Sequence, residues 1–150
     1  MPLLSRLLIR TALTWLAVGY GVGGLLLAQK GYPFGAWVWS LRYTHVHILL
    51  VGWTIQLASG VAFWILPRLD TSGSRGDERL IWWHYGALNA GVAFAALHDP
   101  LVALAEGDGP LFRGMPMLAA VLYLVAAILF VRHAWPRIVP FRTLPRRDRA

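Results

Sequence analysis

The apolar residues of this chain come in four long blocks rather than in a dispersed pattern. The blocks cover about residues 7–28, 41–66, 80–98 and 116–131. Each block is close to the roughly 20 residues that an α-helix needs to cross a bilayer. Short segments with proline, glycine and charged residues separate them. The pattern predicts an all-α integral membrane protein, a four-transmembrane-helix bundle that forms a single domain over residues 1–150.

The composition agrees with a membrane protein and limits the chemistry that the chain can hold. Hydrophobic residues make up 57% of the sequence and charged residues 14%, whereas charged residues are about a quarter of a soluble domain. The chain has no cysteine, which excludes disulfides, thiolate metal sites, iron–sulfur clusters and covalently attached haem. Any metal or cofactor must therefore be held by histidine, methionine, carboxylate or tyrosine side chains.

The basic residues are concentrated in alternate connecting segments. Of the 14 Lys and Arg residues, three lie in or beside the segments that connect the first block to the second and the third to the fourth: Lys30, Arg42 and Arg113. The others lie near the N-terminus, in the middle segment and in the C-terminal tail: Arg6, Arg10, Arg68, Arg75, Arg79, Arg132, Arg137, Arg142, Arg146, Arg147 and Arg149. By the positive-inside rule, this asymmetry predicts that both termini are cytoplasmic. We expect residues 132–150 to form a basic cytoplasmic tail at the lipid headgroups, so the charge requires no nucleic-acid partner.

The stretch "RYTHVHILLVGW", Arg42 to Trp53, places two histidines inside the second apolar block. Ionisable side chains are costly in hydrocarbon, so each one suggests a function. At 1.5 Å per residue, His45 and His47 lie roughly 6–9 Å inside one end of the block. Residues two apart are about 200° apart around an α-helix. The two imidazoles therefore point to opposite sides, and each is expected to serve a different partner.

Both faces of this predicted helix leave room for a flat group. The residues that follow each histidine on its own face are small or polar: Gly52, Gln56 and Ser59 for His45, and Val51, Thr54 and Ala58 for His47.

The third block has two further histidines on one face. His84 and His98 are fourteen residues apart, with Leu88, Gly91 and Ala95 between them on that face. His98 is expected at a depth comparable to that of His45. A histidine in a membrane helix can also serve only as an interhelical hydrogen-bonding group, and this alternative stays open for all four residues. His133 falls in the predicted basic tail and is given no role.

Haem fits this pattern better than zinc does. Zinc would find only one histidine on each face of the second block, whereas haem needs one or two axial imidazoles and a flat apolar slot. Positive groups near its propionates complete such a site. Arg42 and Arg113 are the arginines expected at the same end of the bundle as the histidine pair.

The second block resembles a known helix. "THVHILLVGWTIQLASGVAFWILPRL" is similar to the tenth helix of subunit I in the haem–copper oxidase superfamily, above all in the C-family oxidases and nitric oxide reductases. "LIWWHYGALNAGVAF" followed by "GPLFRG" resembles the next helix and the loop after it. The chain thus resembles a single four-helix arc of that larger subunit. The resemblance implies a location in the cytoplasmic membrane of a prokaryote.

The resemblance also implies roles for the histidine pair. In that family the first histidine binds a high-spin haem and the second binds a low-spin haem, so His45 and His47 would be axial ligands of haem b iron. The family's copper ligands have no counterpart here, and we expect no copper. The second ligand of the low-spin haem would come from His98, from His84 or from another protomer. A homo-oligomer that shares haem between protomers is the expected assembly.

Four functions remain open at this stage. The leading one is a haem b protein that transfers electrons to or from a redox partner or binds a small gas. The second is a gas-reactive haem enzyme, oxidase-like or reducing nitric oxide. The third is a non-redox accessory or assembly subunit whose histidines only hydrogen-bond between helices. The fourth is copper or zinc handling without haem.

Overall fold

In the computed structural model of the chain, every regular element is a helix within residues 1–69, 73–107 and 109–138, the part that the structure describes. The elements are, in chain order, α1 (Leu3–Gly31), η1 (Ala36–Ser40), α2 (Leu41–His47), η2 (Ile48–Ile55), α3 (Gln56–Ile65), α4 (Glu78–Leu104), α5 (Pro110–Ala134) and η3 (Trp135–Arg137). The four elements η1, α2, η2 and α3 follow one another without a break and form one continuous span, Ala36–Ile65, here called the central span.

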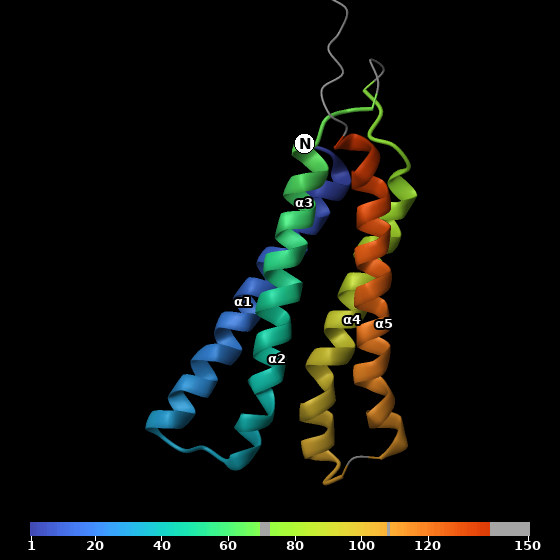
Figure 1. Cartoon of the computed structure of the whole chain (residues 1–150). Coiled ribbons are helices and arrows are strands. Elements are labelled where there is room, and N and C mark those ends of the chain that lie inside the picture. Colours follow the sequence, from blue (N-terminus) through green and yellow to red (C-terminus); the bar gives the residue numbers. More distant parts are fainter. Residues whose placement is uncertain (70–72, 108, 139–150) are drawn as a thin grey trace, which may run out of the picture.

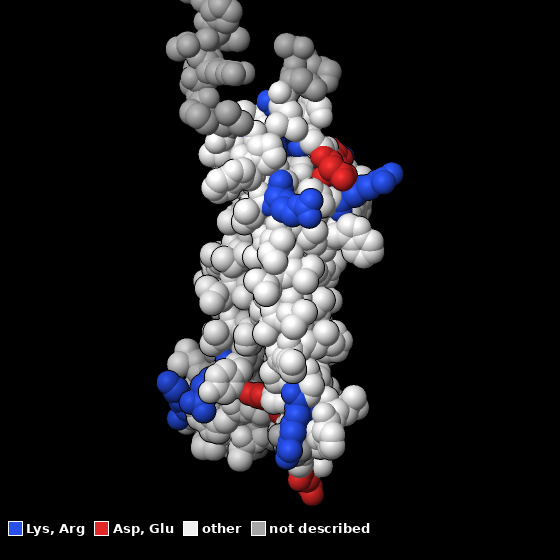
Figure 2. Space-filling model, turned by 45° about the vertical axis from the view of Figure 1, so that its right-hand side comes forward, with Lys and Arg blue, Asp and Glu red and all other residues white. Residues whose placement is uncertain are grey.

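The four predicted spans are confirmed. Four helical segments of 27 to 30 residues are long and apolar enough to cross a membrane. Each is longer than the apolar block that predicted it, because helical hydrogen bonding continues into the polar flanks. Figure 2 shows the charged side chains gathered at the two ends of the molecule, with an uncharged band between them. At 1.5 Å per residue, 27 residues extend over about 40 Å, which exceeds the roughly 30 Å of bilayer hydrocarbon.

The helix boundaries follow from local chemistry. Asp77 caps the start of α4, where its carboxylate accepts a hydrogen bond from the Arg79 backbone N–H at 2.9 Å. Such a cap satisfies one of the backbone donors that a helix start leaves free. Pro110 opens α5 in its first turn, where a missing N–H costs nothing.

The helices pair into two hairpins (Figure 1). One consists of α1 and the central span, and the other consists of α4 and α5. The turn of each hairpin lies at the same end of the molecule, here called the hairpin end; the N-terminus and η3 lie at the other end, the termini end. The hairpins contact each other where Thr44 of α2 donates a hydrogen bond to the Ala96 carbonyl of α4 at 2.5 Å. Trp15 of α1 also reaches across to Asn89 of α4, at 2.8 Å.

The middle of the central span has π-helical hydrogen bonding rather than α-helical. Over Ile48–Ile55 the backbone bonds span five residues, and the Thr54 hydroxyl likewise donates to the Leu49 carbonyl, five residues back, at 3.0 Å. Beyond the wider turn, Gln56 and Ala58 lie on their expected faces, but two other residues do not. Thr54, expected on the His47 face, is exposed on the surface. Ser59, expected on the His45 face, lies in the wall of a cavity on the His47 side.

The last helix extends further than the sequence predicts. The expected tail starts at residue 132, but α5 continues to Ala134 and η3 continues to Arg137. Arg137 is buried, with 3% of its surface exposed. The remainder of the predicted tail, including Arg142, Arg146, Arg147 and Arg149, lies outside the described residues.

Candidate functional site

The two histidines of the central span face opposite hairpins, as their spacing predicts. The His45 Nδ1 lies 2.9 Å from the carbonyl oxygen of Gly19 on α1. The His47 Nδ1 lies 3.4 Å from the hydroxyl of Tyr123 on α5. One ion cannot reach both rings across the helix, so any partners of the two imidazoles are separate.

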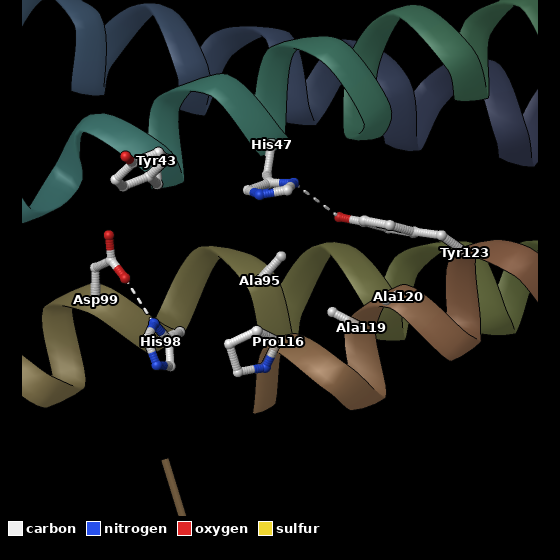
Figure 3. A pocket seen from close by; sticks show the side chains of 9 residues that line it. All are labelled: Tyr43, His47, Ala95, His98, Asp99, Pro116, Ala119, Ala120 and Tyr123. Atoms are coloured by element: carbon white, nitrogen blue, oxygen red, sulfur yellow. Dashed lines mark hydrogen bonds and ion pairs between the residues drawn. The ribbon is translucent and has the colours of Figure 1, made fainter. Parts of the chain in front are cut away.

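His47 opens into a cavity at the hairpin end of the molecule (Figure 3). This hairpin-end cavity has a volume of about 360 Å³. The central span forms one wall, and α4 and α5 form the other. Its lining residues are Tyr43, His47, Ala95, His98, Asp99, Pro116, Ala119, Ala120 and Tyr123. The second wall includes three alanines, which leave space in front of the His47 imidazole.

His98 lines the same cavity and is oriented by its neighbour. The His98 Nδ1 lies 2.6 Å from Oδ1 of Asp99. A carboxylate only accepts hydrogen bonds, so Nδ1 bears the proton and Nε2 keeps a lone pair when the ring is neutral. This carboxylate–histidine arrangement is the one that commonly orients a histidine toward a metal. The structure therefore brings His47 and His98 together in one cavity, from facing helices.

Tyr123 is held beside His47 by a glycine. A Cβ placed on Gly91 of α4 would lie 2.7 Å from two carbons of the Tyr123 ring, closer than side chains pack. The absence of a side chain at Gly91 thus lets the ring lie against α4. The ring stacks beside the His47 imidazole, with centroids 6.0 Å apart. Tyr123 lines two cavities at once, because it also forms part of the cavity next to His84.

His45 lines a smaller cavity on the other side of the central span, against α1. This α1 cavity has a volume of about 250 Å³ and is lined by Gly23, Leu26, Leu27, Lys30, Trp39, Arg42 and His45. A Cβ on Gly23 would lie 2.6 Å from Cε1 of His45, so only glycine lets α1 approach this imidazole so closely. Two cations, Lys30 and Arg42, border the cavity. They are suited to an anionic group on a molecule whose body lies against His45.

His84 lies in a third cavity, toward the termini end. This termini-end cavity has a volume of about 460 Å³ and is lined by Val51, Ile55, Ala58, Ser59, Ala62, His84, Leu88, Tyr123, Ala127, Phe130 and Val131. His84 and His98 share one face of α4, as their spacing predicts, but they line different cavities. His84 is therefore separated from the His45/His47 pair.

The two arginines expected near the haem propionates lie in different surroundings. Arg42 borders the α1 cavity, whereas Arg113 is exposed in the first turn of α5 and lines none of the three cavities described above. The cation that accompanies Arg42 is Lys30. Sequence reasoning missed Lys30, Asp99 and Tyr123 as site residues. Only Asp99 has a local signal, because it directly follows His98.

The donor chemistry of these cavities fits haem. His45 and His98 both have Nδ1 within hydrogen-bond distance of an oxygen acceptor, which leaves Nε2 lone pairs of the kind that bind haem iron. Within residues 1–69, 73–107 and 109–138, no group of three or more His, Cys, Asp or Glu side chains is arranged to hold a metal ion.

The chain matches no family model, no curated protein and no solved structure.

Proposed function

We propose that the chain is a membrane haem b protein that transfers electrons or binds a small gas, with His47 as the principal axial ligand. The observation that carries the proposal is the hairpin-end cavity, where His47 and His98 line facing walls that are otherwise mostly small and apolar. An interhelical hydrogen-bonding role alone would not require a cavity between two imidazoles. Haem bound there would supply a one-electron redox centre.

The chain's own residues have defined tasks at that site. Asp99 holds the His98 ring in one tautomer, so that Nε2 is directed away from the carboxylate. Tyr123 holds the His47 ring from the side. Ala95, Ala119 and Ala120 keep the volume in front of the rings open and apolar.

A second haem on the α1 side completes the proposal. His45 would be its axial ligand, and Lys30 and Arg42 would pair with its propionates. The α1 cavity is small and lies between α1 and the start of the central span, so a second copy of the chain has to cover the haem's other face. Such a homo-oligomer of multi-pass chains in the cytoplasmic membrane of a prokaryote is part of the proposal.

A second candidate function has its own observation. The Nδ1 atoms of His45 and His84 both lie within 2.9 Å of backbone carbonyls on neighbouring helices. Interhelical hydrogen bonds of this kind would suit a non-redox accessory or assembly subunit, in which the imidazoles only join helices. The presence or absence of haem separates this function from the first.

Absorption spectroscopy of the detergent-purified protein tests the proposal. We expect a Soret band as isolated and sharp α and β bands after reduction with dithionite. In His47→Ala we expect haem affinity to fall by more than the roughly 10–100-fold that follows loss of an outer-shell partner. Thr54→Ala is the matched control, because Thr54 lies on the same span and is exposed.

Two outcomes would redirect the proposal. Full haem content in His47→Ala would remove His47 as the ligand. A preparation that stays colourless after haem is supplied during expression would favour the accessory function. Addition of CO to the reduced protein then separates the haem functions: a spectral shift indicates an open iron position, as a gas-binding or gas-reducing protein needs, and no shift indicates two histidine ligands.

A further inference from the structure

His84 has a hydrogen-bonding capacity that the fold does not use. Its Nδ1 lies 2.8 Å from the carbonyl oxygen of Ala126 on α5. A carbonyl oxygen only accepts, so Nδ1 bears the proton and donates it, and Nε2 of the neutral ring is an acceptor. This Nε2 is buried and has no hydrogen-bond partner in the described part of the chain. A buried acceptor left without a donor is unfavourable, so a ligand that supplies a donor gains affinity there.

The termini-end cavity lies beside this imidazole. Its walls consist mainly of aliphatic and alanine side chains from the central span, α4 and α5. Ser59 is the other hydroxyl-bearing residue of the wall besides Tyr123, and its hydroxyl already donates to the Ile55 carbonyl at 2.8 Å. The cavity therefore offers an apolar space of about 460 Å³ beside the buried Nε2 acceptor of His84.

We propose that this cavity binds a membrane-soluble aromatic diol of the quinol class, with one hydroxyl donating a hydrogen bond to Nε2 of His84. The apolar walls suit the ring and the start of a hydrocarbon tail. The lone pair of Nε2 suits a hydroxyl donor and not the carbonyl of a quinone, which is itself an acceptor. Nε2 lies just beneath the wall, so binding requires a neighbouring side chain such as Phe130, with its ring centroid 5.1 Å from the imidazole, to turn aside.

The position of the cavity connects this site to the proposed function. Tyr123 lines both the termini-end and the hairpin-end cavities, and its hydroxyl lies 3.4 Å from the His47 Nδ1. A quinol in the termini-end cavity is thus separated from the His47 cavity by about one side chain. The proposal concerns binding of the quinol at His84, which does not depend on haem.

Binding of decylubiquinol and decylubiquinone to the purified full-length chain in detergent tests the proposal. Quenching of tryptophan fluorescence gives the Kd of each, with the quinol kept reduced under anaerobic conditions. We expect the quinol to bind about fivefold to tenfold more tightly than the quinone, the ratio that one net hydrogen bond of about 1–1.4 kcal/mol supplies. His84→Leu should remove this preference and leave quinone binding unchanged.

Two further variants keep the test decisive. His84→Gln retains an acceptor oxygen and should retain part of the preference for quinol. Leu88→Trp fills the cavity from the same helix without removing the imidazole, and it should weaken binding of both compounds. Size-exclusion profiles identify any variant that fails to fold, and the Kd values of the remaining variants then test the proposal.

The results that would overturn the proposal are distinct from those that test haem binding. Equal affinities for quinol and quinone, or an unchanged quinol Kd in His84→Leu, would overturn it. A changed haem spectrum in His84→Leu would identify His84 as an iron ligand and would also overturn it. Quinol binding in a preparation without haem would leave this site standing and would remove the proposed function.

Discussion

The imidazole tautomers are the most informative features at the scale of single residues. In His45, His84 and His98 an oxygen acceptor lies within 2.9 Å of Nδ1. The acceptor is a backbone carbonyl in two cases and a carboxylate in the third. Each neutral ring is thereby fixed with its lone pair on Nε2. The chain thus holds three imidazoles ready to accept a hydrogen bond or an iron ion.

Gly23 provides a test of the α1 cavity at this scale. In Gly23→Ala the new Cβ would lie 2.6 Å from Cε1 of His45, so either the ring or α1 must move. We expect the variant to be less stable than the matched Gly24→Ala by roughly 1–3 kcal/mol, the usual cost of overpacking. A Cβ on Gly24 meets only open space. Both variants gain the same helix propensity from the Gly→Ala change, so that gain cancels when their stabilities are compared. Thermal unfolding in detergent measures the difference, and equal melting temperatures would contradict the close contact.

The opposite directions of His45 and His47 could be predicted from the sequence, because two residues on one helix differ by a fixed angle. The partner of His47 could not be predicted in this way. Tyr123 is 76 positions further along the chain, and its place depends on Gly91 of another helix. Tertiary packing of this kind leaves no local pattern. Lys30 carries no local signal for a site, because a lysine just after an apolar block is typical of the end of a membrane span.

At the scale of elements, the π-helical segment is the feature that the sequence did not predict. The sequence of residues 48–55 is compatible with either an α-helix or a π-helix, since apolar residues occupy almost every position and mark no face. Val51, Gly52, Gln56 and Ala58 lie on their expected faces, whereas Thr54 and Ser59 do not. Ser59 consequently faces the termini-end cavity, where it helps to close the wall near His84.

A buried arginine joins the ends of two elements. Arg137 of η3 donates from Nε to the Pro67 carbonyl at 2.9 Å, and a terminal nitrogen donates to Phe63 and Leu66 at 3.1 and 2.7 Å. These carbonyls belong to the C-terminal end of α3, which has no further helical donors and attracts positive charge. A second terminal nitrogen lies 3.1 Å from Nε2 of His133. Arg137 thus caps α3 from the opposite hairpin.

Removal of this cap should be costly. We expect Arg137→Met to lower the free energy of unfolding by at least about 2 kcal/mol, because hydrogen bonds from a charged donor are worth about 1.5–3 kcal/mol and the Phe63 carbonyl stays buried. Arg137→Lys keeps the charge but not the planar set of donors, so it should restore only part of the loss. Arg132→Met is the matched control, since Arg132 is exposed on the preceding helix. Denaturation in mixed detergent measures all three, and equal stability of both Met variants would contradict the cap.

At the scale of the whole molecule, the number of spans and their order follow from hydropathy alone, because only helices satisfy every backbone hydrogen bond within a single segment in lipid. The packing of the helices and the cavities between them do not follow from hydropathy. They depend on small residues at helix contacts, such as Gly23 and Gly91, and on long-range contacts such as that between Thr44 and Ala96. The sequence therefore predicts which histidines belong to the candidate site but not the cavities in which they lie.

The orientation of the molecule in the membrane is open to direct measurement. The chain has no cysteine, so single cysteines report unambiguously. The basic residues gather at the termini end, and we expect that end to be cytoplasmic. In intact spheroplasts a membrane-impermeant maleimide should label Tyr32→Cys at the hairpin end and leave Glu78→Cys unlabelled until the membrane is permeabilised. Both residues are exposed. The reverse labelling pattern would contradict the predicted topology.

The position of Arg137 along the chain sets the order in which the protein can be completed during its synthesis. The carbonyl of Leu66 and the guanidinium that caps it are 71 residues apart. At roughly 5–20 residues per second, the ribosome delivers Arg137 roughly 4–14 s after Leu66. During that interval α1 and the central span have to remain in the membrane as a pair without their cap. Insertion thus has two stages. The first hairpin enters the membrane without its cap, and the second hairpin then supplies Arg137 as the cap.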